Sequence, residues 1–147
     1  LHTAYRRQRQ MCIRDSVPAG HSKTSFIDAE DIAAVAVTAL RDPKYLGQAL
    51  EITGPEAITY NQAAQIMTTE LGVPITYSKP SLLKFRRTML QRGIKKEFVN
   101  VMIMLYVITQ LGNAKTVNHT IETILHRPAT TFTEFVRRNK ALFLNQK

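Results

Sequence analysis

Hydrophobic residues change their spacing along the chain, and the change predicts where strands give way to helices. Residues 24–27 read as a short strand. Between positions 32 and 40 apolar residues recur every three or four positions, as on one face of a helix. Asp28 is placed to cap that helix, and the pair Asp42-Pro43 ends it. The chain therefore opens with a strand followed by a helix.

The same pair of patterns repeats before the strand signals stop. Residues 48–53 alternate between polar and apolar, which predicts a second strand. Thr59 and Gln62 have the spacing of a capping box, and a helix is expected over 60–71. A third extended piece follows at 74–77. Two strand and helix units in succession indicate an α/β sheet with crossover helices.

Only helices are predicted beyond about residue 80. Four are expected, at 81–92, 95–111, 116–126 and 132–144. The last begins with a second capping box, Thr131 and Glu134. We interpret this part as a small, mostly helical lobe over about 80–147 that lies on the sheet.

The first sixteen residues differ in character from the rest. They show no hydrophobic periodicity, and residues 11–16 resemble the translation of a sequencing adapter, so we expect 1–16 to be non-native and disordered. Their four arginines and one aspartate contribute +3 of the formal charge of +9, which leaves +6 for the remainder. A basic balance of that size permits anion binding without requiring nucleic acid.

The distribution of charged and apolar residues argues against nucleic-acid and membrane partners. Residues 71–96 hold seven basic residues and no acidic one, but no recognition motif or aromatic stacking platform accompanies them. We therefore favour a solvated helix face over a nucleic-acid surface. The most apolar run, 98–111, is too short to cross a bilayer, so no membrane partner is expected.

Few residues have the types and spacing that catalysis needs. Cys12, the only cysteine, lies in the adapter-like stretch, which leaves no thiolate nucleophile and agrees with a cytoplasmic location. No other residues fall at metal-ligand spacing, and no metal is expected. Asp28 and Asp31 are either an acid–base pair or helix-capping residues, and we favour capping.

Three phrases in a fixed order resemble the NmrA-like family, atypical short-chain dehydrogenases/reductases that bind NAD(P). They are SFIDAEDIA at 25–33, LEITGPEA at 50–57 and RPATTFTEF at 127–135. The family includes NAD(P)H azoreductases and quinone oxidoreductases. The resemblance implies that residues 17–147 are the carboxyl-terminal half of a Rossmann-type domain, with a helical lobe that closes over the nicotinamide of NADP or NAD and over a substrate.

The sequence departs from the family in two places. The glycine-rich phosphate loop is not present, so we assign no cofactor-binding residue here and expect that loop upstream. His126 stands where many relatives have glycine, which affects the local turn. Catalytic residues are also unassigned, because no tyrosine is followed four positions later by the lysine of the usual Tyr-x-x-x-Lys pair.

The candidate substrate pocket combines one loop with two helices. In the loop, His21, Ser22 and Phe26 resemble the family's substrate-side segment. From the helices, we expect apolar and aromatic side chains to wall a pocket for a flat acceptor: Phe85, Phe98, Met102, Met104 and Tyr106. Ordinary core packing explains the same helical residues, and an exposed loop explains His21.

The resemblance implies hydride transfer from NAD(P)H to a small-molecule electron acceptor that is quinone-like or an azo compound. Two alternatives stay open. One is a non-catalytic NAD(P)-sensing regulator that acts through a protein partner. The other is a nucleotide-sugar epimerase or reductase of the extended short-chain group.

We predict that the 147-residue chain does not bind NADPH, because backbone N–H groups in a glycine-rich turn are what hold the pyrophosphate. A fluorescence titration should show no saturable change at micromolar NADPH. Saturable micromolar binding would contradict the prediction.

Overall fold

The computed structural model describes residues 17–145, so the expectation that residues 1–16 are non-native and disordered lies outside the described part. Helices dominate the structure, and a small sheet joins them. The elements are β1 (Lys23–Ser25), α2 (Ala29–Arg41), the 3-10 helix η1 (Pro43–Tyr45), β2 (Ala57–Thr59), α3 (Tyr60–Leu71), α4 (Leu82–Gln91), α5 (Lys96–Gln110), α6 (Thr120–Leu125), α7 (Phe132–Arg138) and α8 (Lys140–Asn145).

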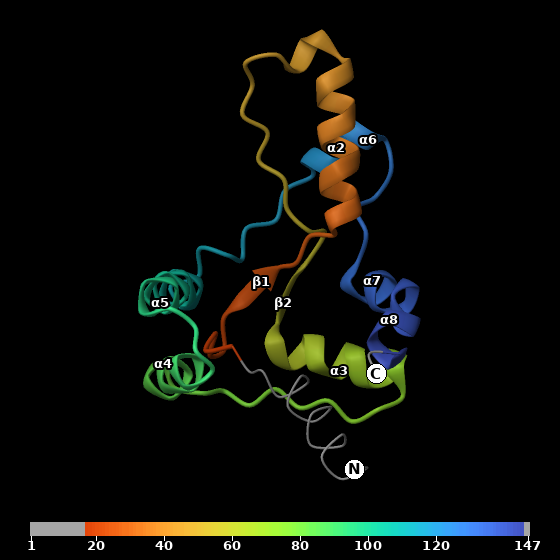
Figure 1. Ribbon diagram of the computed structural model, residues 1–147. Helices are drawn as coiled ribbons and strands as arrows, with labels where there is room; N and C mark the ends of the chain where they lie inside the picture. Colours follow the sequence, from red (N-terminus) through yellow and green to blue (C-terminus); the bar gives the residue numbers. More distant parts are fainter. Residues whose placement is uncertain (1–16, 146–147) are drawn as a thin grey trace.

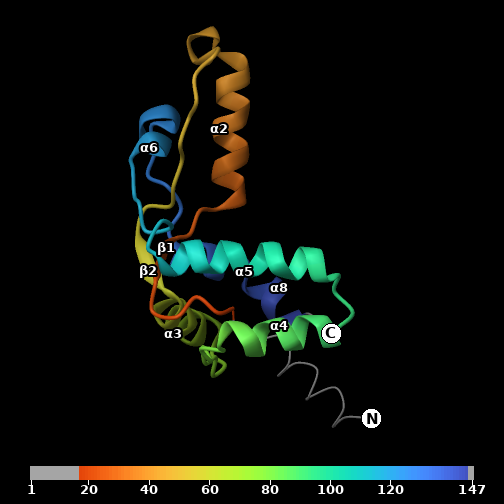
Figure 2. The same ribbon diagram turned by 90° about the vertical axis from the view of Figure 1, so that its left-hand side faces the viewer.

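The helices gather in three groups around the two strands (Figure 1). The first group is α2 with η1 and α6, which stands above the strands. The second is the pair α4 and α5, on one side of them, and the third is α3 with α7 and α8, on the other. Figure 2 shows α4 and α5 lying side by side, at a level below α2. The helices after residue 80 are divided among all three groups. The predicted boundary of a helical lobe near residue 80 stays a prediction.

The sheet differs from the expected pattern. β1 and β2 pair antiparallel, with Thr24 opposite Ile58. The strand predicted at 48–53 was wrong, because this segment makes no backbone ladder within the described residues. Its alternation is nevertheless real, since Leu50 and Ile52 pack on the core while their neighbour Glu51 is exposed.

Asn118 explains both this error and the late start of α6. Its backbone N–H donates to Thr53 Oγ1 at 2.9 Å, and its side chain donates to the Glu51 carbonyl at 3.1 Å. These bonds hold residues 116–118 extended beside 51–53, so the helix predicted from 116 begins at Thr120 instead. Hydrogen bonds of Asn118 thus replace a ladder of backbone hydrogen bonds between two strands. The spacing of apolar residues does not predict such side-chain bonds.

Helix starts follow the predicted caps closely. The Asp28 carboxylate accepts from the Glu30 N–H at 2.9 Å, and both predicted capping boxes form, at Thr59 and at Thr131. The helix predicted over 132–144 is divided at Asn139 into α7 and α8. His126 ends α6 in the left-handed region at φ 53, a conformation that favours glycine.

Two separate apolar cores hold the groups together. One joins α2 and α6 through Val35, Ile121 and Ile124, and the other joins α4 and α5 through Phe85, Met89 and Val99. Among residues 17–145, no helix combines the length and the apolar content that crossing a bilayer requires.

Gly54 allows the turn before β2 to lie against the backbone of Phe26, in the loop after β1. A Cβ built at this position would lie 1.7 Å from the carbonyl oxygen of Phe26. The close contact involves backbone on both sides, so no side-chain rotation can relieve it. The loop after β1 and the turn before β2 are therefore in register only with glycine at this position.

We predict that Gly54→Ala lowers the free energy of unfolding by more than about 3 kcal/mol, because the backbone of Phe26 must move. Urea denaturation followed by circular dichroism measures the loss. Gly93→Ala is the control: its φ is 79 and nothing lies within 4 Å of the added Cβ, so its cost should be about 1 kcal/mol. Equal losses in the two variants would contradict the steric argument.

Candidate functional site

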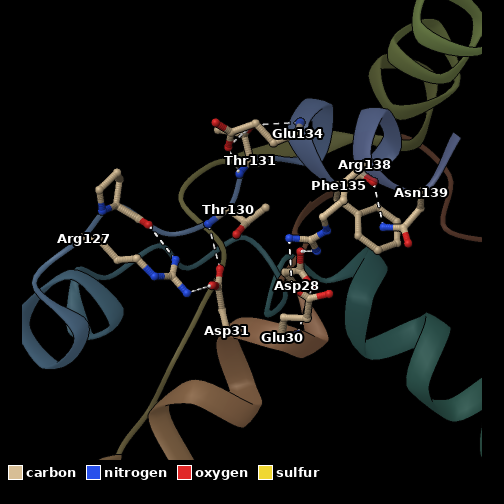
Figure 3. Close-up of polar contacts among 11 residues, drawn as sticks. Asp28, Glu30, Asp31, Arg127, Thr130, Thr131, Glu134, Phe135, Arg138 and Asn139 are labelled. Atoms are coloured by element: carbon tan, nitrogen blue, oxygen red, sulfur yellow. Dashed lines mark hydrogen bonds and ion pairs between the residues drawn. The ribbon is translucent and has the colours of Figure 1, made fainter.

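Two buried carboxylates at the start of α2 bind the carboxyl-terminal part of the chain (Figure 3). Asp31, 1% exposed, accepts from the Arg127 Nη2 atom at 2.7 Å and from the backbone N–H of Thr130 at 2.7 Å. Asp31 thus holds the segment between α6 and α7 and makes no cap of its own helix. The predicted capping interpretation is correct for Asp28 and wrong for Asp31.

Asp28 makes a second connection beside the first. Besides capping α2, its carboxylate forms an ion pair with Arg138 at the end of α7. The other guanidinium nitrogen of Arg138 lies 3.0 Å from Glu30 Oε2. We call the four residues Asp28, Asp31, Arg127 and Arg138 the carboxylate clamp. Every carboxylate oxygen of the two aspartates has a partner within the protein. These partners account for the burial of the pair without an acid–base role.

The electrostatics of Asp31 follow from these partners. Burial raises the pKa of Asp31, but the hydrogen bonds from Thr130 and Arg127 outweigh that effect and leave the pKa below its ordinary value. The aspartate is therefore charged at neutral pH. A charged, fully paired carboxylate suits a structural connection.

A small hollow of about 180 Å³ lies against the clamp. Its walls come from the loop after β1 and from the start of α7: Phe26, Ile27, Asp28, Thr130, Thr131, Phe132 and Phe135. The polar groups of Asp28 and Thr131 are already used in caps, so the hollow offers an apolar surface. It has room for one small ring and no free acid or base.

The structure places the predicted pocket residues in three locations. His21 is exposed, with Lys79 Nζ 3.0 Å from its ring, and the Ser22 hydroxyl donates to the Ala19 carbonyl at 2.6 Å. Phe26 packs between Tyr60 and Phe132, at ring distances of 5.4 and 5.2 Å.

The helical members of the set are divided. Phe85 is 4% exposed and packs against Met102 and Tyr106, which lie together in the core of α4 and α5. Phe98 and Met104 are 60% and 54% exposed on another side of α5. Their assignment to a substrate pocket stays a prediction.

Two tyrosine rings pack together where the start of α3 meets the segment 72–81, and a third tyrosine lies on α5. Tyr60 and Tyr77 lie with their rings 5.5 Å apart, and Tyr106 packs its ring edge-on against Phe85 at 5.4 Å. The Tyr77 hydroxyl donates to the Val17 carbonyl at 2.8 Å and accepts from the Ala19 N–H at 3.2 Å. We call Tyr60, Tyr77 and Tyr106 the tyrosine cluster.

Loop 17–22 is held against this cluster from both sides. Tyr77 binds it from the segment 72–81, and Gln110 at the end of α5 donates to the Pro18 carbonyl. The loop carries the predicted residues His21 and Ser22, so the structure brings that loop to the tyrosine cluster. Sequence reasoning had treated the tyrosines one by one and missed their convergence, because they are separated by 17 and 29 positions in the chain.

Two members of the tyrosine cluster have raised pKa values. Burial raises the pKa of Tyr106, and the neighbouring tyrosines raise it further; burial also raises the pKa of Tyr77, although backbone N–H groups oppose the shift. Both hydroxyls are therefore neutral at physiological pH. Aromatic faces with neutral hydroxyls suit a flat, conjugated ligand. Among residues 17–145 no three histidine, cysteine, aspartate or glutamate side chains gather as metal ligands.

The fold is that of the carboxyl-terminal halves of NAD(P)-binding, Rossmann-like reductases of known structure. No protein-family model matches the chain. It is 35% identical over 127 residues to the NAD(P)H azoreductase of Xenophilus azovorans, which is 86% of this chain and 44% of the azoreductase.

Two solved structures show the same fold at low sequence identity. Citrobacter sp. triphenylmethane reductase, complexed with NADP(H), superposes with a TM-score of 0.76 at 16% identity, over 90% of this chain and 46% of that one. The NADPH-dependent quinone oxidoreductase of Escherichia coli gives 0.73 at 24% identity, over 82% and 44%. The resemblance to NmrA-like NAD(P)-binding proteins is confirmed, and the chain spans less than half the length of these relatives.

The described residues do not fit the pyrophosphate of a dinucleotide. A phosphate needs free N–H groups at a strand-to-helix turn. At the turn from β1 to α2 the Glu30 N–H donates to Asp28, and Glu30 and Asp31 add negative charge in the first turn. At the turn from β2 to α3 the Thr59 side chain caps the helix. Both helix starts are therefore closed to an anion by the chain's own side chains.

We predict that Asp31→Asn lowers the free energy of unfolding by about 2 kcal/mol at pH 7, because it removes the charge opposite Arg127. The lowered pKa of Asp31 means that its contribution is present above about pH 4 and is lost as the pH falls through the folded-state pKa. Urea denaturation at pH 7 and pH 3 should show a gap between variant and parent that narrows in acid.

The control for this prediction is Glu51→Gln, which removes an exposed carboxylate and should leave stability nearly unchanged at both pH values. An Asp31→Asn gap that is as large at pH 3 as at pH 7 would show that charge is not the cause.

Proposed function

We propose that this chain forms the acceptor side of an NAD(P)H-dependent oxidoreductase, with the nicotinamide cofactor held by residues outside it. The observation that carries the proposal is the 35% identity to NAD(P)H azoreductase over 86% of the chain. The likeness to reductases of triphenylmethane dyes and quinones supports it at the level of fold. All three relatives have names that pair a nicotinamide donor or a reductase activity with a conjugated organic acceptor or dye.

The acceptor we propose is a flat, conjugated molecule, quinone-like or azo, seated on the tyrosine cluster and loop 17–22. Tyr106 supports this location because its ring, which packs edge-on against Phe85 at 5.4 Å, presents an aromatic surface on α5. The aromatic row continues from Tyr60 to Phe26, which belongs to the predicted pocket. Stacking on such a row orients a planar ligand without needing a charged partner.

In this arrangement the chain's own task is binding, orientation and exclusion of water. The bound nicotinamide supplies a hydride, and a proton from solvent completes the reduction of the acceptor. The neutral hydroxyls of Tyr60 and Tyr106 donate hydrogen bonds to the acceptor's oxygen or nitrogen atoms, which stabilises negative charge as the hydride arrives; the Tyr77 hydroxyl already donates to the Val17 carbonyl. No strongly perturbed base is required.

The proposal is tested in a protein of the relatives' length that contains this chain as its carboxyl-terminal half. We expect oxidation of NADPH that depends on an added quinone, azo dye or triphenylmethane dye. In that protein Tyr106→Ala should raise the KM for the acceptor by about 10-fold, equivalent to about 1.4 kcal/mol, and leave the KM for NADPH unchanged.

Leu83→Ala is the matched control, because Leu83 is 80% exposed on α4 and lies outside the tyrosine cluster. It should change neither constant. NADPH binding without turnover of any of the three acceptor types would contradict the proposal and favour a regulator that senses the cofactor. A change in the KM for NADPH with Tyr106→Ala would contradict the placement of the acceptor.

A further inference from the structure

A histidine and a lysine lie in contact beside the proposed acceptor site. The Nζ atom of Lys79 is 3.0 Å from Nε2 and 3.2 Å from Nδ1 of His21. Both side chains are exposed, and within residues 17–145 neither forms an ion pair with a carboxylate. The pair therefore presents N–H donors to solvent with no negative partner of its own.

Hydrogen bonds of the loop bring the two side chains together from positions 58 residues apart. The hydroxyl of Tyr77, two positions before Lys79, is hydrogen-bonded to the backbone of segment 17–19. The Ser22 N–H and hydroxyl donate back to the same segment and close the turn that carries His21. The pair thus belongs to loop 17–22, which lies at the lower end of β1 beside α4 and α5 (Figure 1).

The two segments that form this contact carry positive charge only. Residues 17–27 contain His21 and Lys23 and no acidic residue, and residues 71–96 contain seven basic residues and no acidic one. Glu70, just before the second segment, is bound to Arg137. An anion that approaches the pair is therefore attracted without competition from a carboxylate of either segment.

The end of α5 does not cancel this attraction. Gln110 places that end against loop 17–22, where the helix dipole is negative. The side chain of Lys115 lies beside Gly112 and offsets the dipole. Glu97, the one acidic residue of α5, is thirteen positions before Gln110, about 20 Å along the helix.

We propose that His21 and Lys79 bind an anionic substituent of the acceptor, a carboxylate or a sulfonate. The inference rests on the proposed function, in which the acceptor ring lies on the tyrosine cluster beside the same loop. The Lys79 ammonium has three N–H donors and the imidazole accepts one of them, so two remain for an oxyanion. Stacking on aromatic rings leaves a planar ligand free to turn in its plane. A charged contact at one end fixes which way round it lies.

Steady-state kinetics in a protein of the relatives' length test the assignment with two azo dyes of one skeleton. One dye carries an aryl carboxylate, and the other carries an uncharged carboxamide in its place. We expect a higher kcat/KM for the carboxylate dye. Lys79→Gln should lower the ratio of the two kcat/KM values about 10-fold, the loss expected for one charge-assisted hydrogen bond at an exposed site. His21→Ala should lower it by a smaller factor, because the ammonium stays in place.

Lys84→Gln is the matched control, because Lys84 is an exposed lysine of the same basic segment but lies on α4. It should leave the ratio unchanged. A ratio that Lys79→Gln does not alter, or that Lys84→Gln lowers equally, would overturn the proposal. An unchanged ratio with a raised KM for NADPH in Lys79→Gln would assign the pair to a phosphate of the cofactor instead, which also overturns it.

Equilibrium binding of the two dyes to the same protein, followed by their absorption spectra, separates this inference from the proposed function. Tighter binding of the carboxylate dye that Lys79→Gln abolishes, without turnover of either dye, would support the anion contact and contradict the proposed activity. Turnover of both dyes with equal kcat/KM would support the activity and overturn the anion contact. Absence of binding of either dye would overturn both.

Discussion

The structure depends on the carboxylate clamp, in which two aspartates at the start of α2 hold two arginines from the last third of the chain. Asp31 and Arg127 are 96 positions apart, and Asp28 and Arg138 are 110 positions apart. A buried carboxylate without its partner is costly, so the clamp fixes the position of α7 relative to α2. Helix α7 packs on α3 and is bound to it by the Arg137–Glu70 ion pair. The clamp therefore also helps to position α3, whose first residue is Tyr60. The aromatic row of the proposed acceptor site is therefore positioned by charges that do not belong to it.

The three sequence phrases that resemble the family meet in this framework. The phrase at 25–33 contains both aspartates, and the phrase at 127–135 contains Arg127 and Thr130. The phrase at 50–57 contains Gly54, whose lack of a side chain lets its backbone approach Phe26. The residues that carry the resemblance are thus largely those that lock the segments to one another. Such residues identify a fold, whereas the acceptor site that we propose rests on the tyrosines.

Local chemistry was predictable from the sequence, and long-range pairing was not. Thr59 with Gln62 and Thr131 with Glu134 were predicted as capping boxes because all their partners lie within four residues. The role of Asn118 was missed because its bonds reach to Glu51 and Thr53, 67 and 65 positions away. The pairing of Asp31 with Arg127 and the convergence of the tyrosine cluster were missed for the same reason. Each of these depends on tertiary packing, of which a local pattern of polar and apolar positions carries no record.

In the function we propose, this chain binds the acceptor, and the pyrophosphate of the cofactor is bound elsewhere. Amide hydrogen exchange in a protein of the relatives' length tests that division most directly. An acceptor analogue should slow exchange in loop 17–22 and in the segment 72–81, while NADPH alone should leave the first turns of α2 and α3 unchanged. Slower exchange in those two helix starts on addition of NADPH, with no effect of the acceptor on loop 17–22, would contradict the account.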